Sequence, residues 1–224
     1  MDIRWLSHAA FELKHDGVTV LIDPFITGNP VAPVEADALE ADAILLTHGH
    51  EDHFGDVVSI AKRTGATVQA ITEIAAEISQ EGIEVIDTNI GGTASYEWGS
   101  VRLVPAWHTS ITPNGTVSTP AGLVIEMGGK VIYDTGDTAL FSDLALPGQR
   151  QKIDIAMICI GGHYTMDRHD AVVAAGLIGA EVVIPKHYDT FPPIATDVQA
   201  FKSAVEAAGH ARVEVLEVNG TYSA

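Results

Sequence analysis

The amino-acid sequence predicts a layered α/β protein in which two mixed sheets carry helices on their outer faces. Two observations lead to this prediction. Hairpins dominate the first half of the chain, where short apolar runs alternate with turn residues such as Asp16-Gly17. Strand–helix units lie between the hairpins, and a layered fold buries the apolar faces of both kinds of element. A doubly wound parallel sheet is the alternative, but it needs a helix after most strands, and the hairpins argue against it.

The elements of the first half are assigned from turn residues and apolar runs. Two apolar runs flank Asp16-Gly17 and predict a hairpin, and a short strand precedes it. The run over residues 43–46 is typical of a buried strand, and the helix after it is closed by Gly65. Thr72 begins a second helix, which ends before Gly82. The expected strands are residues 3–6, 10–13, 18–22, 43–46 and 67–71, and the first helix covers residues 57–63.

The second half repeats these patterns. Gly128-Gly129 joins two apolar runs into a hairpin, and the run over residues 153–160 is typical of a buried strand. Two helical stretches and a closing strand complete the assignment. The expected strands are residues 101–106, 122–126, 130–133, 153–160, 181–184 and 213–218, and the expected helices are residues 170–177 and 198–208.

Length and composition indicate one globular domain over residues 1–224, since hydrophobic residues make up 46% and charged residues 19% of the chain. No run of 18 apolar residues occurs, and no apolar segment with a cleavage site follows Met1. Cys159 is the only cysteine and lies in an apolar run, so we expect a buried, unreactive thiol and no internal disulfide. A cytoplasmic location is the expectation.

The charge balance excludes some partners. Thirty acidic residues against 12 basic ones give a formal charge of −18, which repels phosphate backbones and anionic lipid. We therefore expect a small-molecule substrate, with neither nucleic acid nor membrane as a partner. A homo-oligomer remains open.

Five of the expected apolar strands run directly into a residue with a metal-ligand type of side chain. Strand ends on a rigid sheet can converge on one point, and the loops there build sites. Scattered surface histidines would not prefer these places. The residues are His48, His108, Asp134 with Asp137, His163 and His187.

The segment His48-Gly49-His50-Glu51-Asp52-His53 is the sharpest local signal. In an extended stretch, His48 and His50 point to the same side. Asp52 and His53 then begin a turn and helix and can face a second centre. Imidazole and carboxylate together suit zinc, iron, manganese or nickel. The alternative, a polar helix start with coincidental histidines, leaves their concentration beside a buried strand unexplained.

The segment His48–His53 supports a metal-binding interpretation of three residues that lie further along the chain. His108 and His187 would each otherwise be interpreted as loop histidines, and Asp137 as a turn or N-cap residue. With the first cluster present, we interpret all three as metal ligands. A carboxylate can bridge two cations, which makes Asp137 the bridging candidate.

Together these residues resemble the metallo-β-lactamase superfamily, whose metal-binding pattern is a His-x-His-x-Asp-His segment followed by a lone His, a lone Asp and a lone His. Asp23 looks like the superfamily's early aspartate. The stretches around Ser7-His8, Gly162-His163-Tyr164 and Pro185-Lys186-His187-Tyr188 are similar to those of uncharacterised metal-dependent hydrolases close to the L-ascorbate-6-phosphate lactonases. The resemblance covers nearly the whole chain and implies a four-layer αββα sandwich with the site at one edge between the sheets.

The resemblance also implies roles for the ligands. It assigns one divalent cation to His48, His50 and His108, and a second to Asp52, His53 and His187, with Asp137 between them. Zn²⁺ is the expected cation, and Mn²⁺, Ni²⁺ or Fe²⁺ occur in relatives. His50 stands where the di-iron flavoprotein branch carries glutamate, which disfavours redox chemistry. No cysteine ligand is present, unlike in some β-lactamase branches, which disfavours antibiotic hydrolysis.

Two cations held close together lower the pKa of a bridging water, so that hydroxide exists near neutral pH. We therefore expect a metal-dependent hydrolase that uses a metal-bridging hydroxide on a small-molecule ester or lactone, which could carry a phosphorylated sugar. Hydrolysis of a small phosphodiester is the second interpretation. A non-catalytic metal-binding or sensing module is the third, and the intact ligand set argues against it.

Further residues are assigned around this centre. Asp52 and His163 are the expected catalytic residues, Asp52 as a proton shuttle and His163 as an oxyanion or substrate contact. His8, Tyr164 and Tyr188 are the expected substrate-binding residues. Lys186 either points to solvent or meets a substrate anion, and solvent is the favoured alternative. The expected substrate-binding loops are residues 26–34 and 110–120.

Overall fold

The computed structural model of the protein describes residues 1–224 and contains two mixed sheets of seven strands each. The strand order is β14-β1-β2-β3-β4-β5-β6 in the first sheet and β13-β12-β11-β10-β9-β8-β7 in the second. In each sheet the pairs at one end are antiparallel and the pairs at the other end are parallel. The two mixed sheets predicted from the sequence are therefore confirmed.

The first sheet begins with an antiparallel meander and continues with parallel strands. Asp16 and Gly17 turn the chain between its second and third strands with positive φ angles of 47° and 83°, as a tight hairpin requires. The strands are β1 (Asp2–Trp5), β2 (Phe11–His15), β3 (Val18–Ile22), β4 (Ala43–Leu45), β5 (Thr67–Ile71), β6 (Val85–Thr88) and β14 (Thr221–Ser223).

The second sheet has the same plan, with antiparallel strands first along the chain and parallel strands after them. Gly128 and Gly129 make the predicted hairpin turn between its third and fourth strands. The strands are β7 (Thr93–Tyr96), β8 (Gly99–Pro105), β9 (Ala121–Met127), β10 (Lys130–Asp134), β11 (Ile155–Cys159), β12 (Val182–Lys186) and β13 (Arg212–Val213).

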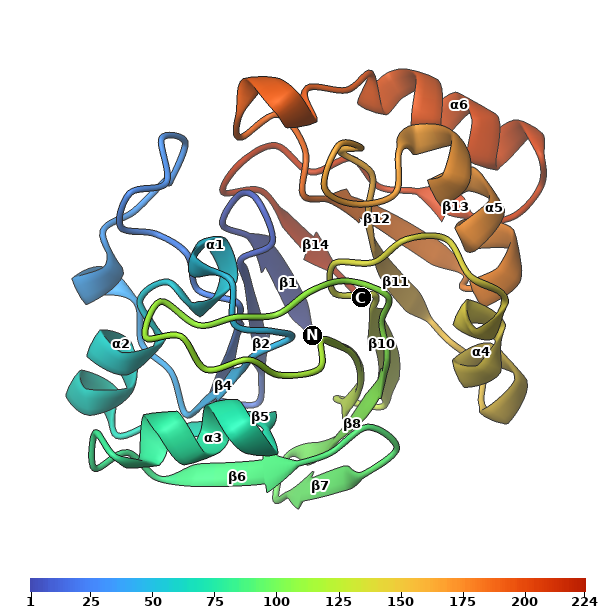
Figure 1. Ribbon diagram of the computed structural model, residues 1–224. Helices are drawn as coiled ribbons and strands as arrows, with labels where there is room; N and C mark the ends of the chain where they lie inside the picture. The colour runs from blue at the N-terminus through green and yellow to red at the C-terminus, as the bar shows by residue number, and fades with distance from the viewer.

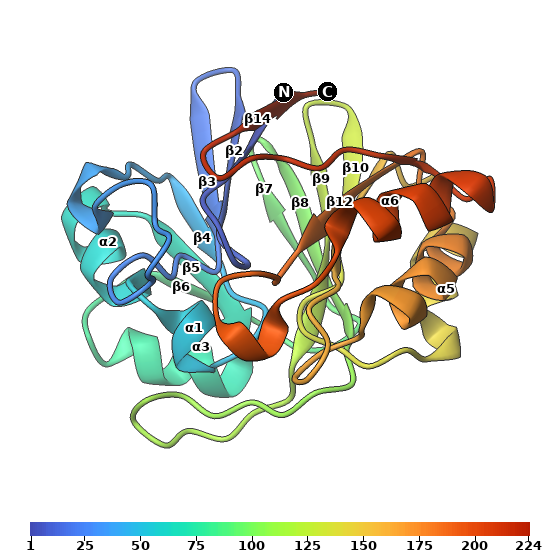
Figure 2. The same ribbon diagram turned by 90° about the horizontal axis from the view of Figure 1, so that it is seen from above.

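Helices cover the outer face of each sheet, and Figure 2 shows the resulting order of helices, sheet, sheet and helices. The first set is α1 (Glu51–Phe54), α2 (Val57–Thr64) and α3 (Thr72–Ser79), and the second is α4 (Leu146–Arg150), α5 (Arg168–Ile178) and α6 (Val198–Ala207). Three short 3₁₀ turns are η1 (Ala36–Ala38), η2 (Ser142–Ala145) and η3 (Pro192–Ile194). Figure 1 shows the two helical sets on opposite sides of the molecule, which confirms the αββα sandwich. None of the helices has the length and apolar character needed to cross a membrane.

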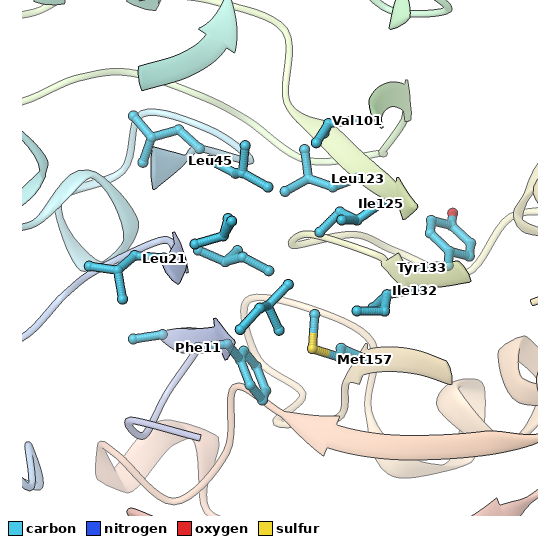
Figure 3. Close-up of a cluster of buried hydrophobic side chains, with 14 of the residues drawn as sticks. Phe11, Leu21, Leu45, Val101, Leu123, Ile125, Ile132, Tyr133 and Met157 are labelled. Carbon is cyan, nitrogen blue, oxygen red and sulfur yellow. The ribbon is translucent and has the colours of Figure 1, made fainter. Parts of the chain in front are cut away.

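The space between the sheets is filled by apolar side chains from both of them, as Figure 3 shows for Phe11 and Leu45 of the first sheet and Leu123 and Ile125 of the second. These side chains come from alternating strand positions, because successive residues of a strand face opposite sides. Cys159 is fully buried in this core, and burial raises the pKa of its thiol. A buried thiol was expected, and the structure confirms it.

The closing strand expected over residues 213–218 is wrong. Only Arg212 and Val213 pair with β12, and the chain then crosses to the first sheet, where β14 pairs with β1. The alternation of apolar and acidic residues over 213–218 matches a strand locally, but those residues bridge the two sheets. β6, β7, β14 and α4 were not expected from the sequence, because they are short and their patterns are weak.

The topology places the ends of six strands at one edge of the sandwich. β1, β3 and β4 run in the same direction, because two antiparallel pairs separate β1 from β3 and a parallel pair joins β3 to β4. By the same argument β8, β10 and β12 share a direction in the second sheet. Their carboxyl ends and the loops after them can therefore build one site between the sheets.

A buried ion pair lies just before this edge. Lys186, the last residue of β12, has its Nζ 2.5 Å from Oδ1 of Asp134, the last residue of β10, and both side chains are fully buried. Burial alone would lower the pKa of Lys186, but the carboxylates of Asp134, Asp23 and Asp137 outweigh it and raise that pKa. Both expectations for Lys186, solvent exposure and contact with a substrate anion, are therefore wrong. Its ammonium balances carboxylates inside the protein.

Replacing Lys186 by Met should lower the free energy of unfolding by about 3–5 kcal/mol, because Asp134 would be left as an unpaired buried charge. The double variant with Lys186→Met and Asp134→Asn removes both charges and should be more stable than Lys186→Met alone. Lys62→Met, which breaks an exposed pair with Glu81, is the control and should cost less than about 1 kcal/mol. Urea unfolding at matched metal content measures all three. A double variant less stable than Lys186→Met would contradict the pairing.

Candidate metal centre

Residues that follow the six aligned strands meet at one edge of the sandwich. From the first sheet, His8 follows β1, Asp23 follows β3 and His48 follows β4. From the second sheet, His108 follows β8, Asp137 follows β10 and His187 follows β12. His50, Asp52 and His53 join them from the start of α1. All seven predicted ligands are thus brought together, with His48, His53, Asp137 and His187 buried.

Several of these residues have a backbone conformation that side chains other than glycine rarely adopt. The φ angles of His8, Asp23 and His187 are 53°, 44° and 57°. Each such conformation costs on the order of 1–2 kcal/mol and persists only where the surroundings impose it. The tight turns after β1, β3 and β12 therefore aim these side chains into the gap between the sheets.

Asp23 orients two of the histidines. Its Oδ2 lies 2.7 Å from Nδ1 of His53 and accepts a hydrogen bond of 2.6 Å from the Thr47 hydroxyl. The Thr47 oxygen in turn lies 3.0 Å from Nδ1 of His48. The Thr47 hydroxyl donates its proton to Asp23, so its oxygen accepts a hydrogen bond from Nδ1–H of His48. His53 likewise donates from Nδ1 to Asp23. Both histidines therefore direct the lone pair of Nε2 into the site.

Asp137 occupies the middle of the cluster. Its Oδ2 lies 3.0 Å from Nε2 of His187, 3.3 Å from Nε2 of His53 and 3.7 Å from Nε2 of His108. Yet Asp137 Oδ1, His53 Nε2 and both ring nitrogens of His187 are buried without a hydrogen bond. Leaving a buried polar atom unpaired costs about 1–3 kcal/mol, so this arrangement requires a further partner.

The donor atoms fall into groups small enough to hold single cations. His48, His50 and His108 form one group, and His8, Asp52, His53 and His187 form another, each with its donor atoms within 4.8 Å of one another. Nε2 of His48 lies only 3.0 Å from Nδ1 of His50. These two sets match the ligand division that the resemblance implied, with His8 added to the second. A third group, His48, His53 and Asp137, overlaps both of them.

The electrostatics of the cluster favour a cation. Burial would raise the pKa of Asp137, but His187 and His53 hold it well below its usual range, so the carboxylate is charged. Burial would lower the pKa of His53, but Asp137 and Asp23 raise it well above its usual value. Burial lowers the pKa of His48. Protons and metal ions compete for the same nitrogens, so carboxylates that attract a proton to His53 also attract a metal ion.

A cavity of about 710 Å³ opens over the cluster. Its floor carries the imidazoles and carboxylates, and its walls carry apolar and aromatic side chains. No Lys or Arg lines it, and Glu51 adds a negative charge. The wall residues are Phe25, Thr27, Gly28, Thr109, Tyr164, Phe191, Pro193 and Ile194.

Known proteins agree with this geometry. A model of the beta-lactamase superfamily domain matches residues 2–187, a stretch that includes every ligand named above. The chain belongs to the beta-lactamase superfamily. A metallo hydrolase of known structure from Ignicoccus hospitalis is 39% identical and superposes with a TM-score of 0.91, covering 100% of this chain and 98% of that one.

Curated members of the superfamily extend the similarity. A UPF0173 metal-dependent hydrolase from Ligilactobacillus salivarius is 47% identical over 201 residues, which span 90% of this chain and 91% of the relative. One from Methanopyrus kandleri is 46% identical over 228 residues, 99% of each chain. The predicted superfamily is confirmed, whereas the similarity to L-ascorbate-6-phosphate lactonases stays a prediction.

The residues expected to surround the candidate metal centre differ in whether they line the cavity above it. Tyr164 lines the cavity and is 57% exposed. His163, its neighbour, is exposed and does not line the cavity, although its ring packs edge-on against that of Tyr164 with the centroids 4.4 Å apart. Tyr188 is buried, stacks on Trp5 at 5.3 Å and lines a different cavity. Neither His163 nor Tyr188 lines the cavity over the metal centre, and their expected roles stay predictions.

His8 lines the cavity but is already engaged by the protein. Its Nε2 lies 3.1 Å from Oδ2 of Asp52, and its Nδ1 lies 2.9 Å from the Thr190 hydroxyl. Burial and the nearby His187 lower the pKa of His8 to about 4, so it is neutral. His8 thus orients Asp52, and its contact with substrate stays a prediction.

The cavity walls were only partly anticipated. Thr27 and Gly28 belong to the expected loop 26–34, but the other expected loop does not reach the cavity. Thr112 and Asn114 of that loop donate instead to Glu77 of α3. Phe191, Pro193 and Ile194 were missed, although the Phe-Pro-Pro sequence that begins four residues after His187 was a usable signal for a rigid loop beside the site.

Asp23 provides a test of the orienting network. Asp23→Asn keeps the shape but exchanges an acceptor for an amide, so His53 and Thr47 lose a charged partner. Metal affinity should fall about 10- to 100-fold. Competition with a chromogenic chelator measures the affinity, and Asp56→Asn, which changes a carboxylate that binds only backbone N–H groups outside the cluster, is the control. An unchanged affinity in Asp23→Asn would show that Asp23 does not orient the ligands.

Proposed function

We propose that this superfamily member is a dinuclear metal-dependent hydrolase that cleaves a small, uncharged ester or lactone. The observation that carries the proposal is the pair of donor groups on either side of Asp137, beneath a cavity lined by neither lysine nor arginine. The relatives named metal-dependent hydrolases support the reaction class.

The ligand set fits two cations. His48, His50 and His108 would hold one, Asp52, His53 and His187 the other, and Asp137 both. Histidine-rich sets with carboxylates suit zinc best, and manganese, nickel and iron are the competing ions. Divalent cations there would supply Lewis acidity and lower the pKa of a water toward neutrality.

Asp52 is the residue of the chain that we assign to proton transfer. His8 engages its Oδ2, and the Asp52 side chain is 36% exposed toward the cavity. Burial would raise the pKa of Asp52, but the hydrogen bond from His8 and the charge of His53 hold that pKa below its usual range. Asp52 is therefore ionised and can accept a proton from the attacking water.

The cavity walls indicate the substrate. Phe25, Phe191 and Ile194 offer an apolar surface, and Tyr164 adds an aromatic ring at the exposed side. A phosphate group away from the reacting bond would need arginine or lysine, and the cavity has neither. The formal charge of −18 opposes the approach of anions as well. An uncharged ester or lactone with an apolar chain therefore fits better than a phosphorylated sugar or a phosphodiester.

Metal analysis tests the dinuclear assignment. We expect about two divalent ions per chain, about one in His108→Ala or in His187→Ala, and further loss in Asp137→Ala, because Asp137 serves both groups. Asp143→Ala, an exposed aspartate, is the control. Elemental analysis of the purified proteins gives the counts. Full metal content in Asp137→Ala would contradict the shared position.

A substrate panel tests the reaction. The metal-loaded protein should hydrolyse an uncharged lactone with an alkyl chain at least about tenfold faster, in kcat/KM, than a phosphorylated lactone or bis-p-nitrophenyl phosphate. Tyr164→Ala should lower kcat/KM for the alkyl lactone, and His163→Ala, which removes only a ring packed on Tyr164, should lower it less. Preference for either phosphate compound would overturn the substrate class, and cleavage of none would favour a non-catalytic metal-binding role.

A further inference from the structure

A second cavity, of about 300 Å³, lies on the outer face of the second sheet and shares no lining residue with the cavity over the metal centre. Strand alternation places it there. Arg102 and Val104 of β8 line it, whereas Val101 and Leu103 between them face the core. α4 closes its side with Pro147 and Arg150, and Figure 1 shows α4 beside β10 and β8. The cavity has the size of a small-ligand site.

Two arginines without partners line this cavity. Eight of the 12 basic side chains form ion pairs, but Arg102 and Arg150 form neither an ion pair nor a side-chain hydrogen bond. The Nε atom of Arg102 is also buried without a partner. In a chain with 30 acidic residues, two guanidinium groups left unpaired in one cavity need an explanation. Guanidinium groups of this kind bind carboxylate or phosphate through paired N–H donors.

Tyr133 adds a third polar group to the same cavity. The residue as a whole is 1% exposed and lines the cavity, and its hydroxyl forms no hydrogen bond within the protein, so it can bind a ligand there. Figure 3 shows the hydroxyl pointing away from the apolar cluster between the sheets. The ring lies over Gly122 of β9, where an added Cβ would stand 3.1 Å from Tyr133 Cε2. The absence of a side chain at Gly122 thus makes room for the ring.

The remaining lining residues restrict the ligand further. Val104, Val124 and Pro147 offer apolar contact beside the Tyr133 ring. Glu126 and Asp143 also line the cavity and would repel a ligand with several negative charges. The combination suits one negative charge attached to an apolar body.

We propose that this cavity binds a small organic monocarboxylate, with the carboxylate between Arg102 and Arg150 and the apolar part against Tyr133. The proposal does not depend on the reaction at the metal centre. The proposed site is separate from that centre, because it lies on the outer face of the second sheet, which points away from the core.

Titration calorimetry and ¹H–¹⁵N correlation spectra of the metal-loaded protein test the proposal with benzoate, benzamide and inorganic phosphate as probes. Benzoate should bind about tenfold more tightly than benzamide, which has the same shape and no charge, and more tightly than phosphate. The amide signals of residues 100–104, 124–126 and 146–151 should shift. Arg102→Gln and Arg150→Gln should each weaken benzoate about tenfold, while Arg168→Gln, an unpaired arginine outside the cavity, should not.

Three results would overturn the proposal: no benzoate binding, equal binding of benzoate and benzamide, or shifts confined to the segment His48–His53 and its neighbours at the metal centre. Arg150 is exposed on α4, so Arg150→Gln keeps the fold even if Arg102→Gln does not. Tyr133→Phe removes only the hydroxyl and should weaken benzoate by a smaller factor than either arginine variant.

Discussion

The buried carboxylate of Asp23 is the interaction on which the metal centre depends. It accepts hydrogen bonds from the Thr47 backbone and hydroxyl and from His53, so it joins the end of β3 to the end of β4 and to α1. A buried charge is tolerated only while its partners stay in place. The same contacts therefore fix the position of α1 and the tautomers of His48 and His53. His50 and Asp52, which lie between them in the chain, are positioned as a result.

Much of this could be predicted from the sequence, because the information is local. His48, His50, Asp52 and His53 lie within six residues. His108, Asp137 and His187 stand directly after apolar strands, and parallel strand ends meet at one edge. The hairpins and the strand–helix units likewise depend on turn residues and periodicity that neighbouring positions reveal. Two mixed sheets and a metal centre between them follow from these signals.

The errors concern contacts between distant parts of the chain. Lysine is usually exposed, and nothing near Lys186 in the sequence shows that Asp134 lies two strands away to receive it. His163 and Tyr164 are adjacent and both polar, but a single turn decides which of them faces the cavity. Residues 213–218 have a strand pattern, but pairing with β12 ends at Val213, so the residues after it form no strand there. The pairing of buried charges, the direction of a turn and the crossing of the chain from one sheet to the other all depend on contacts between distant residues, so the local sequence does not reveal them.

The exchange of sheets near the end of the chain has a consequence for biosynthesis. β1 carries the turn that presents His8, and β14 covers its outer edge, although more than 200 residues separate the two strands. During translation that edge of β1 stays unpaired until β14 has left the ribosome, and an open strand edge invites association with other chains. The nascent protein therefore stays vulnerable to aggregation through that edge until the more than 200 residues between the two strands have been made. Contacts of such long sequence separation also slow the folding of the completed chain.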